Sequence, residues 1–534
     1  MQARDAPRIG IEMHLIMRRG TKTRTPLASA ACLTVVTLAA TALPAVGQGN
    51  NTASGSRAVQ LPLSGRQPRS VTVQQSAPVP SGASANVQVQ IQGGFSGSVP
   101  GTDAIPESFD LTLADAIQRG LRANLGIISA DISVQAAQAR RVEARSALMP
   151  SVSVNASENA AKLNLAAEGF SASAFGDPSL NFPTSVGPYH YYDLQGSLQQ
   201  SLLDVTAVRN LRAQGRASEA AVLQAHQGRE EVVLAVTGVY LQLMADLALV
   251  ERQRAEVAYA EESYKQASAQ ADAGNKAPIE ATRSLVQYQT EQQRLLSQLG
   301  EVEKRRVELA RLIGIPLGTH IKPKERLDGL VAEMPPLQDV VQRAWSQRLD
   351  LKAAAAQLQS AEEARKAAAA ERLPSASLTG TYGIQGVNPN QGVPVFQAAV
   401  SVNLPIYLGG RIEADTAQAD AVVKQRRAEL ADQRSSVESD VRTAYIDLQV
   451  ANDQVKLADS NRKLATQTLQ QSQDRFAVGV ADSVEVVSSQ QSLASADHDY
   501  VNSLFAQHVA KVTLAHAMGE AEKDLSELFE RKAP

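Results

Sequence analysis

The sequence contains an internal duplication, and a duplicated chain is expected to fold into two copies of one arrangement of elements. Leu113 and Pro150 recur 224 residues later as Leu337 and Pro374. Residues between them recur at the same offset, with Asp115, Gln118, Arg119 and Leu125 matching Asp339, Gln342, Arg343 and Leu349. Farther along the offset is 205, with Tyr240, Gly274 and Gly314 matching Tyr445, Gly479 and Gly519. The first copy therefore contains about 19 additional residues in its middle.

Each copy opens with a helical pattern and continues with two strand-like segments. The helices are expected over about 113–147 and 337–371, and each stops before a proline, which cannot continue a helix. Alternating apolar and polar residues then predict strands with one apolar and one polar face. The apolar positions are Val152, Val154, Ala156, Tyr192, Leu194 and Leu198 in the first copy, and Ala376, Leu378, Gly380, Tyr382, Phe396, Ala398, Val400, Val402 and Leu404 in the second.

A very long helix follows the strands in each copy. The first copy has no proline between Pro188 and Pro278, and the second has none from Pro405 to the last residue. About 65 residues at ~1.5 Å each span roughly 100 Å, which a compact domain does not need. Apolar residues recur at alternating spacings of three and four, which is typical of a coiled-coil seam. Examples are Val233, Val236, Tyr240, Leu243, Leu247 and Val250.

Glycines mark where each long helix ends and where a shorter helix returns. Gly274 and Gly479 are expected in the turn at the helical tip, and the returning helices are expected to end at Gly314 and Gly519. Each copy therefore contains a helical hairpin after its strand pair.

The N-terminal region predicts export. A basic segment precedes an apolar stretch from Leu27 to Leu43 with small residues after it, so residues 1–47 are expected to be a signal peptide, with Met17 as an alternative start. The only cysteine, Cys32, lies in this stretch, so the mature chain is expected to have no thiol. Residues 48–107 are rich in Gly, Ser, Gln and Pro and are expected to be disordered. No later run of eighteen apolar residues occurs, so no transmembrane helix is expected.

This order of elements, repeated after an export signal, resembles the TolC-type outer-membrane efflux protein family over about residues 108–520. Two local motifs carry the resemblance in the second copy. The strand-to-helix junction reads Asn403-Leu404-Pro405-Ile406-Tyr407 followed by Gly409-Gly410-Arg411, and the helical tip reads Arg475-Phe476-Ala477-Val478-Gly479. The first copy departs from both motifs, with Gln200-Ser201-Leu202-Leu203-Asp204 at the junction and Gln270-Ala271-Asp272-Ala273-Gly274 at the tip.

The expected fold is mainly α-helical, with a long coiled-coil tunnel and four barrel strands per protomer. Four strands alone leave open edges whose backbone groups lipid cannot satisfy, so a membrane barrel must be shared between chains. Three protomers would make a twelve-stranded barrel with polar faces inward and apolar faces toward lipid. The domains are expected to be a first repeat over 108–330, a second over 331–520 and a C-terminal tail over 521–534.

The resemblance implies a passive channel in the outer membrane with a long periplasmic tunnel. It would be a homotrimer embedded in outer-membrane lipid, and would serve a tripartite efflux or type I secretion system that exports small molecules or proteins. Its implied partners are a periplasmic adaptor, also called a membrane fusion protein, and an inner-membrane pump of the RND or ABC type. No cofactor is implied.

The resemblance also points to gate candidates near the helical tips. In the family an acidic residue about six positions after the tip glycine can face the constricted lumen, and here Glu280 and Glu485 occupy these positions. Threefold symmetry would turn each into a carboxylate ring that favours cations. Lys276 and Arg283 in the first copy could pair with them. The alternative is that all these charges lie on solvated helix faces.

Other classes of function find little support in the sequence. Basic residues are dispersed, which disfavours nucleic-acid binding. No nucleophile elbow, phosphate loop or metal-ligand spacing occurs, so neither catalysis nor a metal is expected. The main alternative is a periplasmic coiled-coil adaptor or scaffold, which usually has a single helical hairpin flanked by strand-rich domains. Here two strand pairs interrupt two helical units at equivalent places.

Overall fold

The computed structural model describes most of the chain after the expected signal peptide. All the described residues belong to one compact unit over 56–534. They are 71–75, 87–91, 93–100, 108–165, 167, 183–274, 277–327, 334–478, 480 and 483–522. The expected signal peptide, 1–47, and the tail beyond residue 522 lie outside the described residues.

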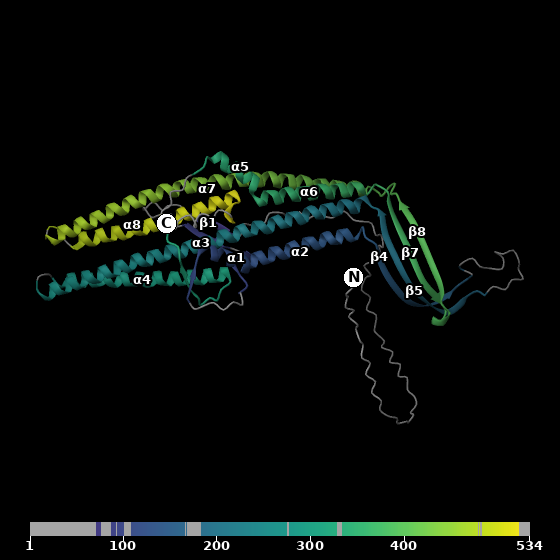
Figure 1. Cartoon of the computed structure of the whole chain (residues 1–534), viewed down its shortest axis with the longest axis horizontal. Helices are drawn as coiled ribbons and strands as arrows, with labels where there is room; N and C mark the ends of the chain where they lie inside the picture. The colour runs from purple at the N-terminus through teal and green to yellow at the C-terminus, as the bar shows by residue number, and fades with distance from the viewer. Residues whose placement is uncertain are drawn as a thin grey trace, which may run out of the picture. The chain divides into compact units, whose positions relative to one another are not determined.

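The two copies contain the same elements in the same order (Figure 1). The first comprises α1 (Leu113–Ala123), α2 (Leu125–Ser146), β4 (Ser151–Leu163), β5 (Val186–Leu203), α3 (Val205–Asp272) and α4 (Pro278–Ile313). The second comprises α5 (Leu337–Gln347), α6 (Leu349–Ala370), β7 (Ser375–Gly386), β8 (Val393–Asn403), α7 (Arg411–Ala477) and α8 (Ser483–Met518). The prediction of a mainly helical chain with four longer strands is confirmed.

The opening helix of each copy is two helices, so the prediction of continuous helices over 113–147 and 337–371 was wrong. The breaks fall at Asn124 and Arg348, which are equivalent residues at the repeat offset of 224. At the first break the Asn124 side chain accepts a hydrogen bond from the Gly126 amide and so caps α2. Asparagine favours helix caps over helix interiors because its side chain competes for nearby backbone groups.

The long helices form two hairpins, as predicted. α3 and α7 contain 68 and 67 residues, and α4 and α8 contain 36 each. α3 packs along α4, and α7 packs along α8. α6 contacts both α3 and α7, and α3 also contacts α8, so these contacts join the two copies (Figure 1).

The largest hydrophobic core surrounds the middle of α3. Val233, Val236, Tyr240 and Leu243 are completely buried there, in agreement with the predicted seam. No helix able to cross a membrane was expected, but α3 contains an 18-residue stretch that is apolar enough to do so. Inside the structure, 72% of this stretch is buried. It is therefore the core of the helical assembly. A second core joins α5, α7 and α8.

The expected disorder of residues 48–107 is not met where the structure describes this segment. β1 (Val71–Gln75) pairs antiparallel with β2 (Val87–Ile91), and a 3-10 helix, η1, covers Gly93–Ser96. Phe95 of η1 packs against the core. Its backbone carbonyl accepts a hydrogen bond from the Asn124 side chain at 2.8 Å, so the end of the extension is bound at the first helix break.

Two further sheets complete the fold. β3 (Ser108–Leu111) pairs in parallel with β6 (His320–Pro323) beside the core. The four longer strands form one antiparallel sheet in the order β4-β5-β7-β8. β5 and β7 lie in the middle and come from different copies, so the duplication places β4 and β8 at the two edges.

Candidate functional site

The register of the four-stranded sheet sorts its side chains into two faces. Ser151 pairs with Gln199, Gln199 with Thr379, and Thr379 with Ala399. Because side chains alternate along a strand, the odd-numbered residues in register with these share one face, here called the polar face. It contains Ser153, Asn155, Ser157, Asn159, Asp193, Gln195, Ser197, Ser377, Thr381, Gln385, Gln397 and Ser401.

Hydroxyl pairs link neighbouring strands across the polar face. The side chains of Ser153 and Ser197 are hydrogen bonded at 2.7 Å, and those of Ser377 and Ser401 at 2.9 Å. These contacts join β4 to β5 and β7 to β8. The face can therefore interact with water throughout its length.

The opposite face, here called the apolar face, carries the even-numbered residues of the same register. Val152, Val154, Val400 and Val402 are 65–74% exposed, and Phe396 is 81% exposed. Water is an unfavourable environment for such a continuous apolar surface, which marks a contact with lipid or with another protein. Glu158 and His190 lie on this face toward the loop end of the strands, with 3.5 Å between Oε1 and Nδ1.

The tip of the first hairpin is shaped by a glycine and a proline. Gly274 follows α3 with a φ of +74°, a conformation that L side chains rarely adopt. Pro278 opens α4, where its missing amide proton is not needed. Glu280 lies in the first turn of α4 and pairs with Arg283, 2.9 Å from Nη1 to Oε1. Lys276 lies outside the described residues, so its proposed pairing stays a prediction.

At the second tip the corresponding pair joins two helices. Arg475, in the last turn of α7, lies 3.0 Å from Glu485 in the first turn of α8, measured from Nη1 to Oε1. Phe476, the next residue, is half-buried. Ser472 and Ser489 form a buried hydrogen bond of 2.8 Å between the same helices. Gly479 is outside the described residues. The sequence had singled out both members of the ion pair, but not their contact.

The strand-to-helix junctions of the two copies differ. Gly409 and Gly410 have φ values of +63° and +82°, and Gly410 caps α7. Pro405 lies in the segment between β8 and this glycine pair. In the first copy Asp204 alone separates β5 from α3, and its side chain accepts a hydrogen bond from the Ala207 amide at 2.8 Å. The second copy therefore has the longer connection.

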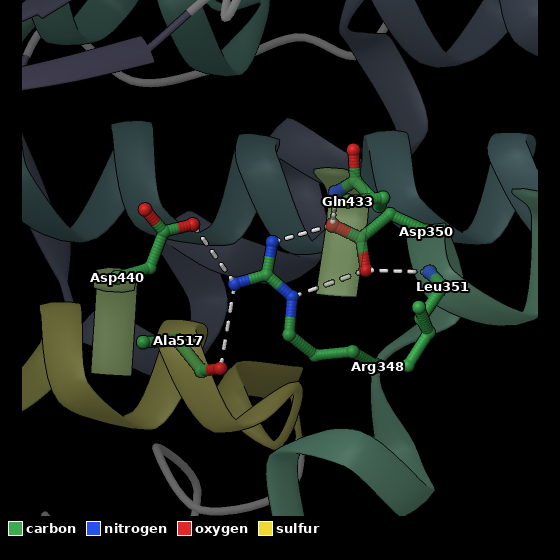
Figure 2. Close-up of polar contacts among 6 residues, drawn as sticks. All are labelled: Arg348, Asp350, Leu351, Gln433, Asp440 and Ala517. Atoms are coloured by element: carbon green, nitrogen blue, oxygen red, sulfur yellow. Dashed lines mark hydrogen bonds and ion pairs between the residues drawn. The ribbon is translucent and has the colours of Figure 1, made fainter. Parts of the chain in front are cut away.

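A buried ionic cluster at Arg348 was not anticipated from the sequence. Figure 2 shows the guanidinium between Asp350 of α6 and Asp440 of α7. Nη1 lies 3.3 Å from Asp440 Oδ2 and also donates to the Ala517 carbonyl of α8. Gln433 of α7 donates to Asp350 at 2.8 Å. One arginine thus connects the α5–α6 break with both helices of the second hairpin.

The cluster fixes the ionisation of Asp350. Burial alone would raise the pKa of this carboxyl, but the hydrogen bonds and charge of Arg348 outweigh burial and hold the pKa below its ordinary value. The repeat signals the break but not the ionic contacts, because Arg348 matches Asn124 at the repeat offset and both precede a leucine that opens a helix. Helix breaks at equivalent positions are therefore held by different chemistry.

No group of side chains suited to a metal ion occurs among the described residues. His190 pairs with Glu158, and His498 contacts Asn502 one helical turn away at 2.9 Å. The candidate functional surfaces among the described residues are the two sheet faces and the two helical tips.

A family model described as outer membrane efflux protein matches residues 116–315 and 340–520. The chain is similar in fold to the outer-membrane channel OprN, with 19% identity over 76% of this chain and 90% of that one, at a TM-score of 0.66. The comparison with curated protein sequences gave no match.

Two further channels show the same fold. VceC of Vibrio cholerae is 17% identical over 76% of this chain and 96% of its own, with a TM-score of 0.66. The open state of the MtrE channel of Neisseria gonorrhoeae is 18% identical over 86% and 97%, with a TM-score of 0.61. The chain therefore belongs to the outer membrane efflux protein family, whose channels lie in the outer membrane and reach into the periplasm through a helical tunnel.

Proposed function

We propose that three copies of this chain form one passive export duct, the outer-membrane part of a tripartite efflux or type I secretion system. The strands would make a closed barrel, and the helices a tunnel toward a periplasmic adaptor and an inner-membrane pump of the RND or ABC type. The duct itself performs no chemistry in this proposal, and the pump supplies the energy.

The observation that carries the proposal is the pair of open edges on the four-stranded sheet. β4 and β8 each pair with a single neighbour and run in opposite directions along the sheet. In lipid the free edge groups of β4 and β8 need hydrogen-bond partners, because no water is available there. β8 of one copy can supply them to β4 of the next as an antiparallel pair, and three copies close a barrel of twelve strands.

The two faces of the sheet fit this closure. Apolar residues facing outward would lie against lipid, and the hydroxyl and amide groups of the polar face would line a water-filled lumen. Exposed Ile406 and Tyr407 follow β8 at the helical end of the strands, where a membrane–water interface favours an aromatic ring with a polar tip. A periplasmic adaptor, the alternative from the sequence, has no need of a sheet with one exposed apolar face.

The helical tips offer the surface for an adaptor. Val478, Val480 and Val484 at the second tip are exposed, as is Ile279 at the first. Apolar side chains gathered around the ion pair between Arg475 and Glu485 would suit a helical partner that covers them and contacts the charges at its rim.

Disulfide crosslinking tests the closure. Because the mature chain is expected to have no thiol, Asn155→Cys on β4 can be combined in turn with Gln397→Cys, Ala399→Cys and Ser401→Cys on β8. We expect at least one combination to give crosslinked dimers and trimers in outer-membrane vesicles, while Asn155→Cys alone gives none. Absence of intermolecular crosslinks from all three combinations would contradict a shared barrel.

A further inference from the structure

The polar face of the sheet carries very little charge. In the paired register of the four described strands, its residues are serine, threonine, asparagine, glutamine, tyrosine or small apolar residues, with one carboxylate at Asp193. Glu158 of β4 occupies an even-numbered position on the other face, and Lys162 lies at the irregularity between Ala161 and Leu163, outside the paired register. Within this paired register, a lumen lined by the polar face would therefore contain one carboxylate per copy and no basic side chain.

Asp193 has no compensating charge among the described residues. Its register neighbours are Ser157 on β4 and Gln385 on β7, both neutral. Its Oδ1 atom is shielded from solvent and accepts no hydrogen bond. The carboxylates at the helical tips differ, because Glu280 and Glu485 each lie within 3.0 Å of an arginine. Of Asp193, Glu280 and Glu485, Asp193 is therefore the carboxylate whose charge is least neutralised by a basic side chain.

We infer that Asp193 determines the charge selectivity of the barrel, so that the duct favours cationic and neutral polar solutes over anions. This inference rests on the proposed trimeric barrel. Three copies would place three carboxylates at one level of the lumen, and rings of carboxylates select for cations. Within a channel bounded by protein and lipid such charges act more strongly than on an open surface.

The position of Asp193 separates this effect from events at the tips. Ten residues of β5 follow Asp193, and Asp204 then joins β5 to α3. At ~3.3 Å per residue these ten residues span about 33 Å. The 68 residues of α3 then add roughly 100 Å at ~1.5 Å per residue before the tip. Exposed charges this far apart are screened from one another at physiological salt.

Reversal potentials in planar bilayers under a potassium chloride gradient provide the test. Asp193→Asn should move the ratio of potassium to chloride permeability toward unity. The matched control is Glu158→Gln, which removes a carboxylate from the adjacent strand but from the opposite face, and it should leave the ratio unchanged. An unchanged ratio in Asp193→Asn channels, or an equal shift in both variants, would overturn the assignment.

Chemical modification of a cysteine at position 193 provides a second test, in which the charge at this position is changed within a single variant. Asp193→Cys would supply the only thiol of the mature chain, and water-soluble thiol reagents can reach it from the lumen. A negatively charged reagent should restore cation preference, and a positively charged one should shift the channel toward anions. Reversal potentials that do not respond to the sign of a reagent bound at this thiol would overturn the inference.

The two proposals fail in different ways. If the unmodified protein forms no conducting channel in bilayers, the proposed duct is wrong and the inference falls with it. If channels form with normal conductance steps but their selectivity is independent of residue 193, only the inference is wrong.

Discussion

Arg475 and Glu485 join α7 to α8 across the tip of the second hairpin, with 3.0 Å between Nη1 and Oε1. The first hairpin has no equivalent bridge among its described residues, because Glu280 pairs with Arg283 within α4 itself. Among the described residues, the contact between Arg475 and Glu485 spans the second tip, whereas the contact between Arg283 and Glu280 stays within one helix. Both arginines are more than half exposed, so the pairs should contribute little to stability and more to the local field.

A first prediction concerns block at the tips. Glu280→Gln combined with Glu485→Gln should weaken block by multivalent cations severalfold, because six carboxylates would be removed from the periplasmic entrance of a trimer. Arg475→Ala should strengthen block, since Glu485 would lose its cross-tip partner. Single-channel recordings with the cation on the periplasmic side would measure both effects. Wild-type sensitivity in both variants would mean that these charges lie outside the constriction.

A second prediction concerns the two faces of the sheet. Val400→Arg should destabilise the folded barrel by about 2–4 kcal/mol if it lies near the membrane midplane, as should charges at Leu378 or Val402. Ser401→Arg, the next residue along β8, should be tolerated, as should a charge at Ser377. Urea titration of the protein in liposomes gives the free energies of unfolding. Equal losses at Val400 and Ser401 would mean that the two faces are assigned wrongly.

A third prediction concerns the Arg348 cluster. Arg348→Met should lower the free energy of unfolding by about 3 kcal/mol, because Asp350 and Asp440, both largely buried, would lose the arginine that neutralises them. Asp440→Asn should cost less, since Arg348 would keep its contacts with Asp350. Denaturant unfolding followed by circular dichroism would compare the variants. A loss below about 1 kcal/mol for Arg348→Met would show that the cluster is freely hydrated.

The same cluster predicts a pH dependence. The pKa of Asp350 is lowered in the folded state, so its stabilising contribution is present above its unfolded pKa and is lost as the pH falls through the folded value. Wild-type protein should therefore lose stability below about pH 4, the ordinary range of an aspartate. Asp350→Asn should lose less over the same interval. Parallel acid profiles for the two proteins would contradict the assignment.

A further prediction concerns Phe95 and the N-terminal extension. A Cβ atom added at Gly126 would lie 2.4 Å from the Phe95 ring, so Gly126→Ala should displace the ring and destabilise the protein. Phe95→Ala should cost about 2 kcal/mol, less than the 3–5 kcal/mol of a fully buried phenylalanine. In the Phe95→Ala background the cost of Gly126→Ala should largely disappear. Additive losses in a double-mutant cycle would show that the extension is not bound there.

The sequence predicted those elements whose apolar residues recur with the period of a helix or of a strand. Apolar spacing and the absence of proline identified the long helices, and alternation, strict in the second copy and weaker in β5, identified the strands and their two faces. The break at Asn124 was missed although its cap, a hydrogen bond from the Gly126 amide, is local and asparagine favours caps. The break at Arg348 was missed because arginine is a good helix former and its contacts with Asp440 and Ala517 are distant in sequence. Phe95 was missed for the same reason, since its polar, glycine-rich surroundings resemble a disordered segment until the core is assembled.

The candidate site was predicted in part. Counting from the tip glycines found Glu280 and Glu485, and Arg283 and Arg475 were already named among the nearby residues. The contact between Arg475 and Glu485 could not be read from the sequence, because it depends on how the turn after Val478 brings two helices together. Asp193 drew no attention for a similar reason, since the alternation in β5 is weak until its register with β4 and β7 is known.

The most direct test of the shared barrel is the mass of the intact assembly. Native mass spectrometry of protein extracted from outer-membrane fractions in detergent should show one dominant species containing three chains. That species should disappear when the detergent is removed, because the apolar face of the sheet needs a lipid-like environment. A monomer recovered from the periplasmic fraction and stable without detergent would contradict the account.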